Sequence, residues 1–300
     1  MAQYNYIGKG SIYIGQSGSL VPVGNCSALQ LGIEEEKKTL SDFENAGGGT
    51  VETVSRITGA TLSMTLHNIS PGNLAIGLRG ETTATAGATV TDEAHANVFV
   101  GSLVLLDRIP NPSAALTATH GVTASWAQST AYSLGDKILD TGHVYVVTVA
   151  GTSGGSEPTW PTNGSTVVDG GVTWDDLGVV ALTENVDYTR VRAGIIAKAG
   201  GKLADGDTVK VSYTAVADNL VQALIESGQE FRLVFDGLNE AKSGKSVVVD
   251  VFKFKPNPTA SLDLIGDDFG ELVIEGDIIK DETKSGAGIS QYFTVRLAAL

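Results

Sequence analysis

The chain has 300 residues, 42% of them hydrophobic and 18% charged, so it can bury one large core or two ordinary ones. Its 37 glycines lie between short apolar runs and are typical of the turns of an all-β protein. The net charge of −14 argues against a protein that grips nucleic acid, because that affinity depends on Lys and Arg neutralising phosphates; solubility alone would also explain the charge.

The sequence indicates the compartment in which the chain folds. It has no run of 18 apolar residues, and its first residues lack the basic and apolar regions of a secretory signal. The single Cys26 excludes an intrachain disulfide, and the Cys and His spacing of a metal site is absent. We expect folding in a reducing cytoplasm, with no membrane anchor, metal or cofactor.

The N-terminal part predicts strands separated by one long loop. Residues 6–14 alternate weakly between apolar and polar side chains, and residues 28–36 alternate clearly. Residues 34–56 are polar, with three consecutive glycines at 47–49, and predict a loop that is either functional or a floppy surface segment. Alternation resumes over residues 57–67.

A short helix and another strand follow. Ser70 suits the N-cap position and Pro71 the first helical turn, while Gly80 predicts the end of the helix. Residues 98–107 are rich in β-branched residues and leucine, and they lead into a stiff double-proline segment at 108–112.

The composition changes over residues 122–181, which predicts a small inserted domain. All three tryptophans lie there, with one basic residue, Lys137, and six acidic ones. Short strands alternate with glycine-containing turns. We therefore predict a discontinuous domain of residues 1–121 and 182–300, interrupted by a small all-β domain of residues 122–181.

After the insert, the strand pattern of the larger domain resumes. Residues 218–225 are ambiguous, because their apolar residues also fit a helix face, with Asp218 as cap and Gly228 as stop. The expected strands are residues 188–196, 208–214, 231–235, 246–254, 272–279 and 292–297.

No motif or cluster indicates an enzyme. The sequence lacks nucleophile-elbow, zinc-protease, phosphate-loop and dinucleotide-binding motifs. Two acidic pairs, 175–176 and 267–268, are interpreted as solvated turn carboxylates, because adjacent strand residues point to opposite faces. The four histidines have no partner spacing and are interpreted as ordinary polar residues: His67, His95, His120 and His143.

Several segments outside the insert resemble phage tail tube proteins, also called major tail proteins. The resemblance lies in residues 29–36, the glycine-containing loop and residues 56–75, whose sequence runs RITGATLSMTLHNISPGNLA. In the C-terminal part it continues through FDGLNEA at 235–241, residues 247–254 and LIGDDFGEL at 264–272. The order of these segments, which cover about 200 residues, is more specific than any one of them.

The resemblance implies a mainly β protein, with a tail-tube-type β-barrel or sandwich and a short flanking helix. Six copies would form a ring, and rings would stack, with other tail proteins, into the hollow virion tail that delivers the genome. DNA would pass through the acidic lumen without specific binding. The 34–56 loop is the candidate ring-stacking element, through Glu34, Glu35, Glu36, Lys37, Lys38, Asp42, Glu44 and Arg56.

The insert resembles small carbohydrate-binding modules related to chitin-binding domains. The resemblance lies in Trp126, Tyr132, the Gly-Asp pair at 135–136 and Tyr145, followed by PTWP at 158–161 and DGGVTW at 169–174. It implies a glycan platform of exposed rings, with Trp160, Trp126 and Tyr132 as candidates. In the competing interpretation, a domain of this size needs its aromatic side chains to build a hydrophobic core. This interpretation predicts that Tyr132, Tyr145 and Trp174 are buried.

Two functions are thus left open by the sequence. The first is a tail tube subunit with an outward decoration, whose bulk would collide with a sheath and so favours a non-contractile tail. The second is a glycan-binding adhesin of a virion or cell surface.

Overall fold

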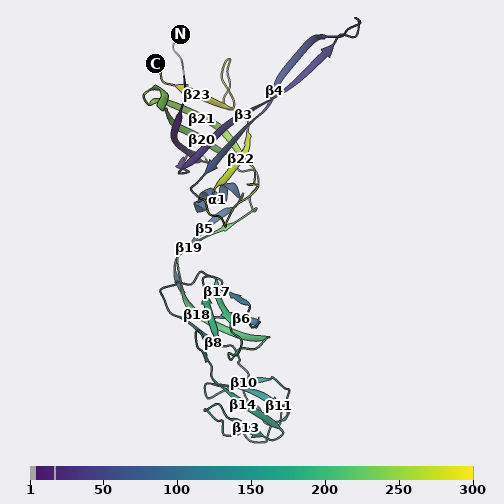
Figure 1. Cartoon of the computed structure of the whole chain (residues 1–300), viewed down its shortest axis with the longest axis vertical. Coiled ribbons are helices and arrows are strands. Elements are labelled where there is room, and N and C mark those ends of the chain that lie inside the picture. The colour runs from purple at the N-terminus through teal and green to yellow at the C-terminus, as the bar shows by residue number, and fades with distance from the viewer. Residues whose placement is uncertain (1–4, 17, 300) are drawn as a thin grey trace. The chain divides into compact units, whose positions relative to one another are not determined.

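The computed structural model describes residues 5–16 and 18–299, and it is mainly β, as the sequence predicted (Figure 1). The described residues contain one α-helix, and no helix among them is long and apolar enough to cross a membrane. The chain divides into two compact units. Unit 1 combines Met1–Thr83 with Asn219–Leu300, and unit 2 is Ala84–Asp218.

Unit 1 is built on one eight-stranded sheet. Its strand order is β2-β1-β20-β21-β22-β4-β3, and β23 also pairs with β21. The bounds are β1 Gly8–Gly15, β2 Val21–Pro22, β3 Cys26–Ser41, β4 Thr50–Leu66, β20 Phe231–Asn239, β21 Lys245–Pro256, β22 Leu272–Ile278 and β23 Phe293–Leu297. The predicted pairing of residues 231–235 with 246–254 is confirmed by the β20–β21 ladder.

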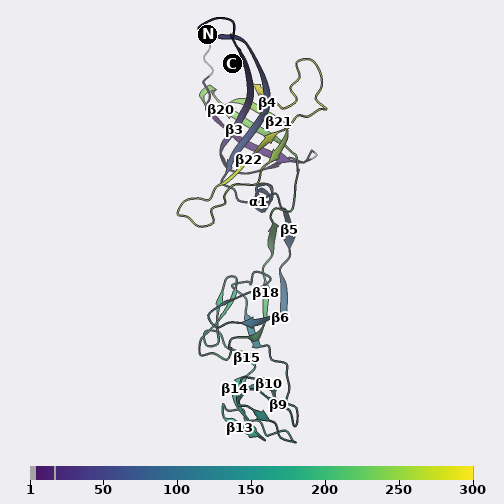
Figure 2. The same cartoon turned by 90° about the vertical axis from the view of Figure 1, so that its right-hand side faces the viewer.

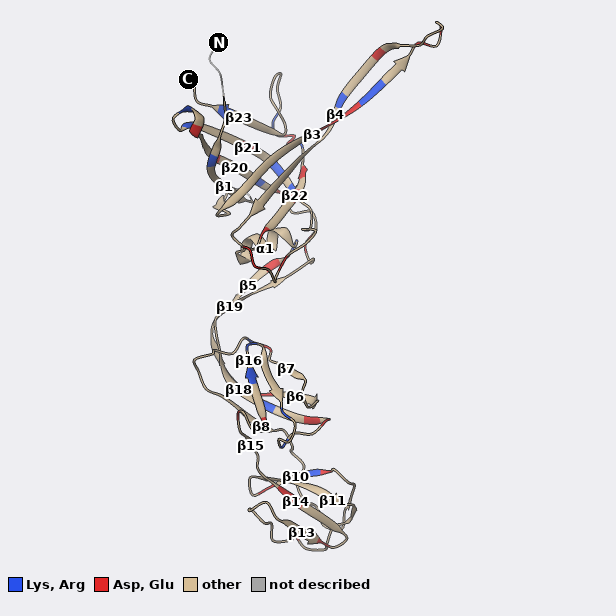
Figure 3. Cartoon of the chain, viewed as in Figure 1, with Lys and Arg blue, Asp and Glu red and all other residues tan. Residues whose placement is uncertain are grey.

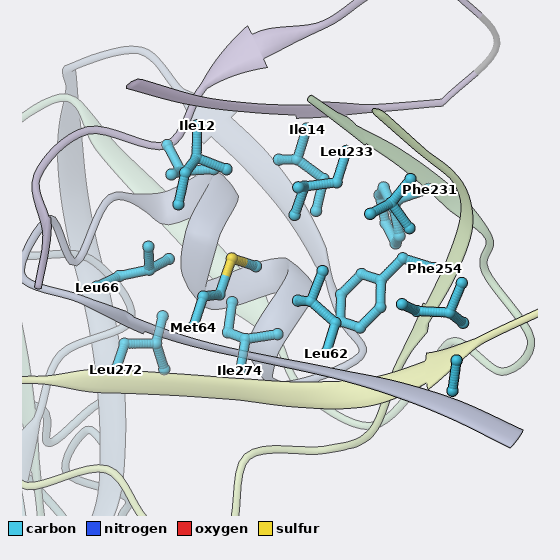
Figure 4. Close-up of a cluster of buried hydrophobic side chains, with 14 residues drawn as sticks. Ile12, Ile14, Leu62, Met64, Leu66, Phe231, Leu233, Phe254, Leu272 and Ile274 are labelled. Atoms are coloured by element: carbon cyan, nitrogen blue, oxygen red, sulfur yellow. The ribbon is translucent and has the colours of Figure 1, made fainter. Parts of the chain in front are cut away.

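The core of unit 1 follows from period-2 alternation. β22 buries every second residue, from Leu272 to Ile278, and the C-terminal half of β4 does the same. The buried side chains of these strands meet those of β1, β20 and β21 in one cluster. Figure 4 shows Leu62, Met64 and Leu66 of β4 in this cluster, with Ile12 and Ile14 of β1 above them.

The predicted helix is confirmed as α1, Pro71–Gly77. The Ser70 hydroxyl accepts a hydrogen bond from the Asn73 amide at 3.2 Å, which satisfies one of the free N–H groups of the first turn. The helix ends at Gly77, three residues before the predicted stop. It packs against the core of unit 1 through Leu74 and Ile76.

The prediction of a polar loop over residues 34–56 is wrong. β3 continues to Ser41 and β4 begins at Thr50, so only residues 42–49 connect them. The ladder between the two strands runs from Cys26 opposite Leu66 to Ser41 opposite Thr50. The segment is therefore the outer half of a long β-hairpin.

Unit 2 contains several small sheets. Their strand orders are β15-β8-β18-β6, β16-β17-β7, β10-β11-β14-β13 and β12-β9. The bounds are β6 Ala88–Val98, β7 Leu103–Leu105, β8 Leu116–His120, β9 Ala131–Tyr132, β10 Lys137–Asp140, β11 His143–Val149, β12 Gly151–Thr152, β13 Thr166–Asp169, β14 Val172–Val179, β15 Ala181–Leu182, β16 Tyr188–Val191, β17 Gly194–Ala197 and β18 Asp207–Ala215.

Two sequence predictions around unit 2 need correction, and one that the sequence left open is resolved. The expected strand at 98–107 contains only the last residue of β6 and the three residues of β7, and residues 99–102 between them lie in no strand. The expected strand at 188–196 is divided by a turn into β16 and β17. The ambiguous 218–225 segment forms a strand, β19 (Asp218–Gln222), which pairs with β5 (Glu81–Thr85). A short 3-10 helix in unit 1, η1, spans Glu240–Lys242.

The predicted domain limits do not coincide with the division between the units. Residues 84–121 and 182–218, assigned from sequence to the larger domain, build a second core in unit 2 that is separate from that of unit 1. Residues 122–181 contain a third cluster of their own. At the base of this segment, the His120 amide donates to the Val180 carbonyl at 2.8 Å. The module of residues 122–181 thus leaves and rejoins unit 2 at adjacent points.

Separate cores predict separate unfolding transitions. Leu272→Ala in unit 1 and Ile195→Ala in unit 2 each remove a side chain with no solvent exposure, so each is expected to cost about 2–5 kcal/mol. In scanning calorimetry, each variant should lower a different transition. The control Val273→Ala, at a partly exposed position on β22, should change stability by less than about 0.5 kcal/mol. Equal shifts of one common transition would contradict two independent units.

Candidate functional site

The outer half of the β3–β4 hairpin, residues 34–57, is the first candidate site and is called the arm below. It continues the ladder of the sheet and extends beyond the other strands of unit 1 (Figures 1 and 2). Register shifts next to Glu34 and next to Leu40 mark irregularities at its base and tip. The arm is therefore a two-stranded ribbon fixed to the sheet at one end only.

Almost every arm residue is exposed, on both faces of the ribbon. The exposed residues include large apolar side chains that sequence reasoning did not select. On the arm and at its base these are Ile33, Leu40, Phe43, Val51, Val54 and Ile57. Apolar side chains collected on one exposed element make the arm a candidate interaction surface.

The charged arm residues lie where the hairpin places them. Of those predicted for ring stacking, Glu34, Glu35, Glu36, Lys37 and Lys38 lie on β3, Arg56 lies on β4, and Asp42 and Glu44 lie in the connecting turn. Figure 3 shows both signs of charge along the ribbon. Glu52 on β4 belongs to the same surface and was missed.

Two local interactions order the arm. The Arg56 guanidinium donates to the Glu36 carboxylate across the ladder, at 2.9 Å from Nε and 2.7 Å from Nη2. In the turn, Asp42 accepts from the Asn45 side chain and from the Glu44 and Asn45 amides, and these bonds lower the pKa of its carboxyl. Exposed interactions of this kind contribute little to stability.

The second candidate site is the aromatic cluster of the module. Tyr145 and Trp174 are fully buried, which confirms their prediction as core residues. Trp160 lies half-buried against both, with ring centroids 4.4 Å from Tyr145 and 5.7 Å from Trp174. Tyr132 packs edge-on against Trp174 at 4.8 Å. The prediction of Trp160 as a freely exposed platform is therefore not met.

Two buried carboxylates organise this cluster. Asp169 accepts from the Trp126 indole at 2.7 Å and from the Gly154 amide at 2.7 Å. Asp176, interpreted from sequence as a solvated turn residue, is buried in β14 and accepts from His143 at 2.8 Å. Burial raises the pKa of Asp176, but its hydrogen bonds with the Gly164 amide, His143 and the Gly178 amide outweigh burial and lower it.

A third carboxylate connects the module to the rest of unit 2. Asp207, at the start of β18, accepts from the Lys137 ammonium of the module, from His120 at 3.1 Å and from the Ala204 amide at 2.7 Å. Burial raises the pKa of Asp207, but these bonds and the Lys137 charge prevail and lower it to about 2. The module is held by a mostly buried ion pair as well as by its two chain connections.

Comparison with known proteins places the chain in a family. A family model described as "Protein of unknown function UCP028589" matches residues 5–159 and 166–296. The chain belongs to this family. The UCP028589 match includes both units and most of the module, and the internal stretch outside it, residues 160–165, begins with Trp160. No curated protein matches the chain significantly.

The Asp207 cluster predicts a pH dependence for unit 2. Because the pKa of Asp207 is lower in the folded state, its contribution is complete above about pH 4 and is lost as pH falls through about 2. Asp207→Asn should destabilise unit 2 by about 2 kcal/mol at pH 7, measured by urea unfolding, and by much less at pH 2. A difference that stays constant from pH 7 to pH 2 would show that the carboxylate charge does not hold the module.

Proposed function

We propose that this protein is the subunit of a phage tail tube, in which six copies form a ring and rings stack into a hollow tube for genome delivery. The arm carries the proposal. An isolated two-stranded hairpin is at best marginally stable in water, and this one has no core beneath either face. An element of that kind gains its packing from a partner, and a repeating assembly of identical subunits supplies one.

The rest of unit 1 is consistent with assembly through strand edges. β3 pairs with β4 and has no second ladder among the described residues, so one of its edges is free along its length. Free edges in natural proteins are usually short or blunted, because they attract other strands. β3 spans 16 residues, which favours a subunit whose edge is covered by neighbouring copies.

The charge balance supports a passage for DNA rather than a binding site. Six copies at −14 each give a ring of −84 charges. DNA binding requires cations that replace the counterions of the phosphates, and an acidic wall disfavours such contacts. In this proposal the subunit is made in the host cytoplasm and becomes part of the virion tail.

The module of residues 122–181 is assigned a peripheral position in the proposed tube. Its chain connections lie next to each other, so it adds a domain without interrupting the sheet of unit 1. We assign it no glycan. The rings offered by the sequence as a platform, Trp126, Tyr132 and Trp160, are partly buried and pack against its core.

Removing the arm should prevent stacking without unfolding the subunit. In the test variant, residues 38–54 are replaced by Asn-Gly, which joins Lys37 to Ser55, a pair already opposed in the ladder, through a two-residue turn. The unmodified protein should form rings and tubes in negative-stain images, and the variant should form no tubes. Its calorimetric transitions should match those of the unmodified chain.

The matched control removes a larger segment that the proposal places outside the contacts. Replacing residues 123–179 by Gly-Ser joins two points that are already adjacent, and tubes should still form. If the unmodified chain stays monomeric under all salt and concentration conditions, the tail tube proposal is overturned. If the control variant folds but loses assembly, the peripheral position of the module is wrong.

A further inference from the structure

A groove opens between β1 and β3, near the two ends of the sheet order in unit 1. Its volume is about 760 Å³, and residues of both strands line it. The apolar part of the lining consists mainly of Ile12, Leu29, Leu31, Phe235 and Val249. All of these belong to the core cluster of unit 1 or pack against it, so the groove is an open extension of that core.

Strand edges border the groove on both sides. β1 pairs with β20 on one side, while β2 covers only Tyr13 and Ile14 on the other. The outer edge of β1 from Gly8 to Ser11 is thus free of ladder partners among the described strands. β3 likewise has a free edge opposite β4. An apolar floor between two free edges suits an extended segment that adds a strand.

Unit 1 also contains an exposed, irregular segment that could add such a strand. Residues 263–270, called the apolar loop below, lie between β21 and β22 and form no regular structure. Three of their side chains are among the most exposed large apolar groups of the chain: Leu264 at 83%, Ile265 at 97% and Phe269 at 94%. Exposure of this extent leaves the loop available to another molecule.

The charges of the two surfaces are complementary. The apolar loop carries Asp263, Asp267 and Asp268 and has no basic residue. Among the described residues that line the groove, one is charged, and it is basic: Lys9 on β1. The apolar side chains of the loop thus match the apolar lining of the groove, and its acidic side chains match Lys9.

We propose that the apolar loop of one copy inserts into the β1–β3 groove of a second copy. Leu264 and Ile265 cover the apolar floor, and the acidic side chains lie near Lys9. The contact is heterologous, because it joins two different surfaces, so each copy can both give and receive a loop, and the contact repeats into a ring or a filament. This inference rests on the proposed function, and it names one contact between the assembling copies.

The single native cysteine provides a direct test, because Cys26 lines the groove. Leu264→Cys and Ile265→Cys, made separately, place a second thiol in the loop. Mild oxidation should then give a ladder of covalent multimers on denaturing gels. The reaction is run at alkaline pH, since burial raises the pKa of the Cys26 thiol. The same variants with Cys26→Ser can form loop-to-loop dimers only, so their ladder should stop at two.

A charge exchange tests the same contact without a cross-link. Lys9→Glu should lower association measured by sedimentation velocity about tenfold, because it replaces an attraction by like-charge repulsion across the contact. Adding Asp267→Lys and Asp268→Lys should restore most of the association. Both sites are exposed, so folding is unaffected. Tubes in electron micrographs without a ladder or charge rescue would overturn this inference and leave the proposed function intact. Absence of all assembly would overturn both, whereas a ladder without tubes would support the contact and reject the tube.

Discussion

Every β-strand has two rows of backbone N–H and C=O groups, and the organisation of unit 1 depends on which rows are paired. β20, β21 and β22 lie inside the sheet, with partners on both sides, and their inward side chains fill the core. β3 and much of β1 keep one edge free. In the arm, β3 has a free edge and both faces of the ribbon are exposed. The unmet hydrogen-bonding capacity of unit 1 is thus concentrated on β1 and β3, and much of its exposed apolar area lies on the arm and on the apolar loop.

The module satisfies a different constraint, because a domain of about sixty residues has little apolar material for a core. Aromatic rings supply the required area, and four of them contact one another around Trp174. The polar atoms that enter with the rings need partners. Asp169 provides one for the Trp126 indole, and the Pro161 carbonyl accepts from the Tyr145 hydroxyl at 2.8 Å. Such requirements explain why rings that resemble a sugar platform in the sequence turn inward.

The sequence predicted those elements whose signal is local. The helix has its own cap and proline, and β20, β21 and β22 are rich in β-branched and aromatic residues, so their positions could be read from neighbouring residues. The arm could not be found in this way. A strand exposed on both faces has no reason to alternate, and its polar residues are indistinguishable from a loop by periodicity. The β-branched residues at 50–57, three valines or isoleucines among them, were the available signal.

The partners of the buried carboxylates were also beyond sequence reasoning. His120 and Asp207 are separated by 87 residues, and His143 and Asp176 by 33, so spacing alone does not relate them. The acidic pair at 175–176 illustrates the point. Alternation correctly implies that its two side chains face opposite ways, but it does not tell which one meets the interior. Register with β11 decides this, and it places Asp176 inside.

In the proposed tube, an arm that lacks packing in the single subunit would couple assembly to ordering. Ordering the backbone of one residue costs about 1–2 kcal/mol of conformational entropy. The hydrogen bonds of a two-stranded ladder alone offset little of this cost in water. Docking of such an arm would therefore yield less affinity than its contact area suggests. In the proposed tube, free subunits would stay apart until another contact raises their local concentration, and the arm would then add its apolar contacts at a smaller entropic cost. The proposed loop-in-groove contact has this property, because its groove is already ordered by the core of unit 1.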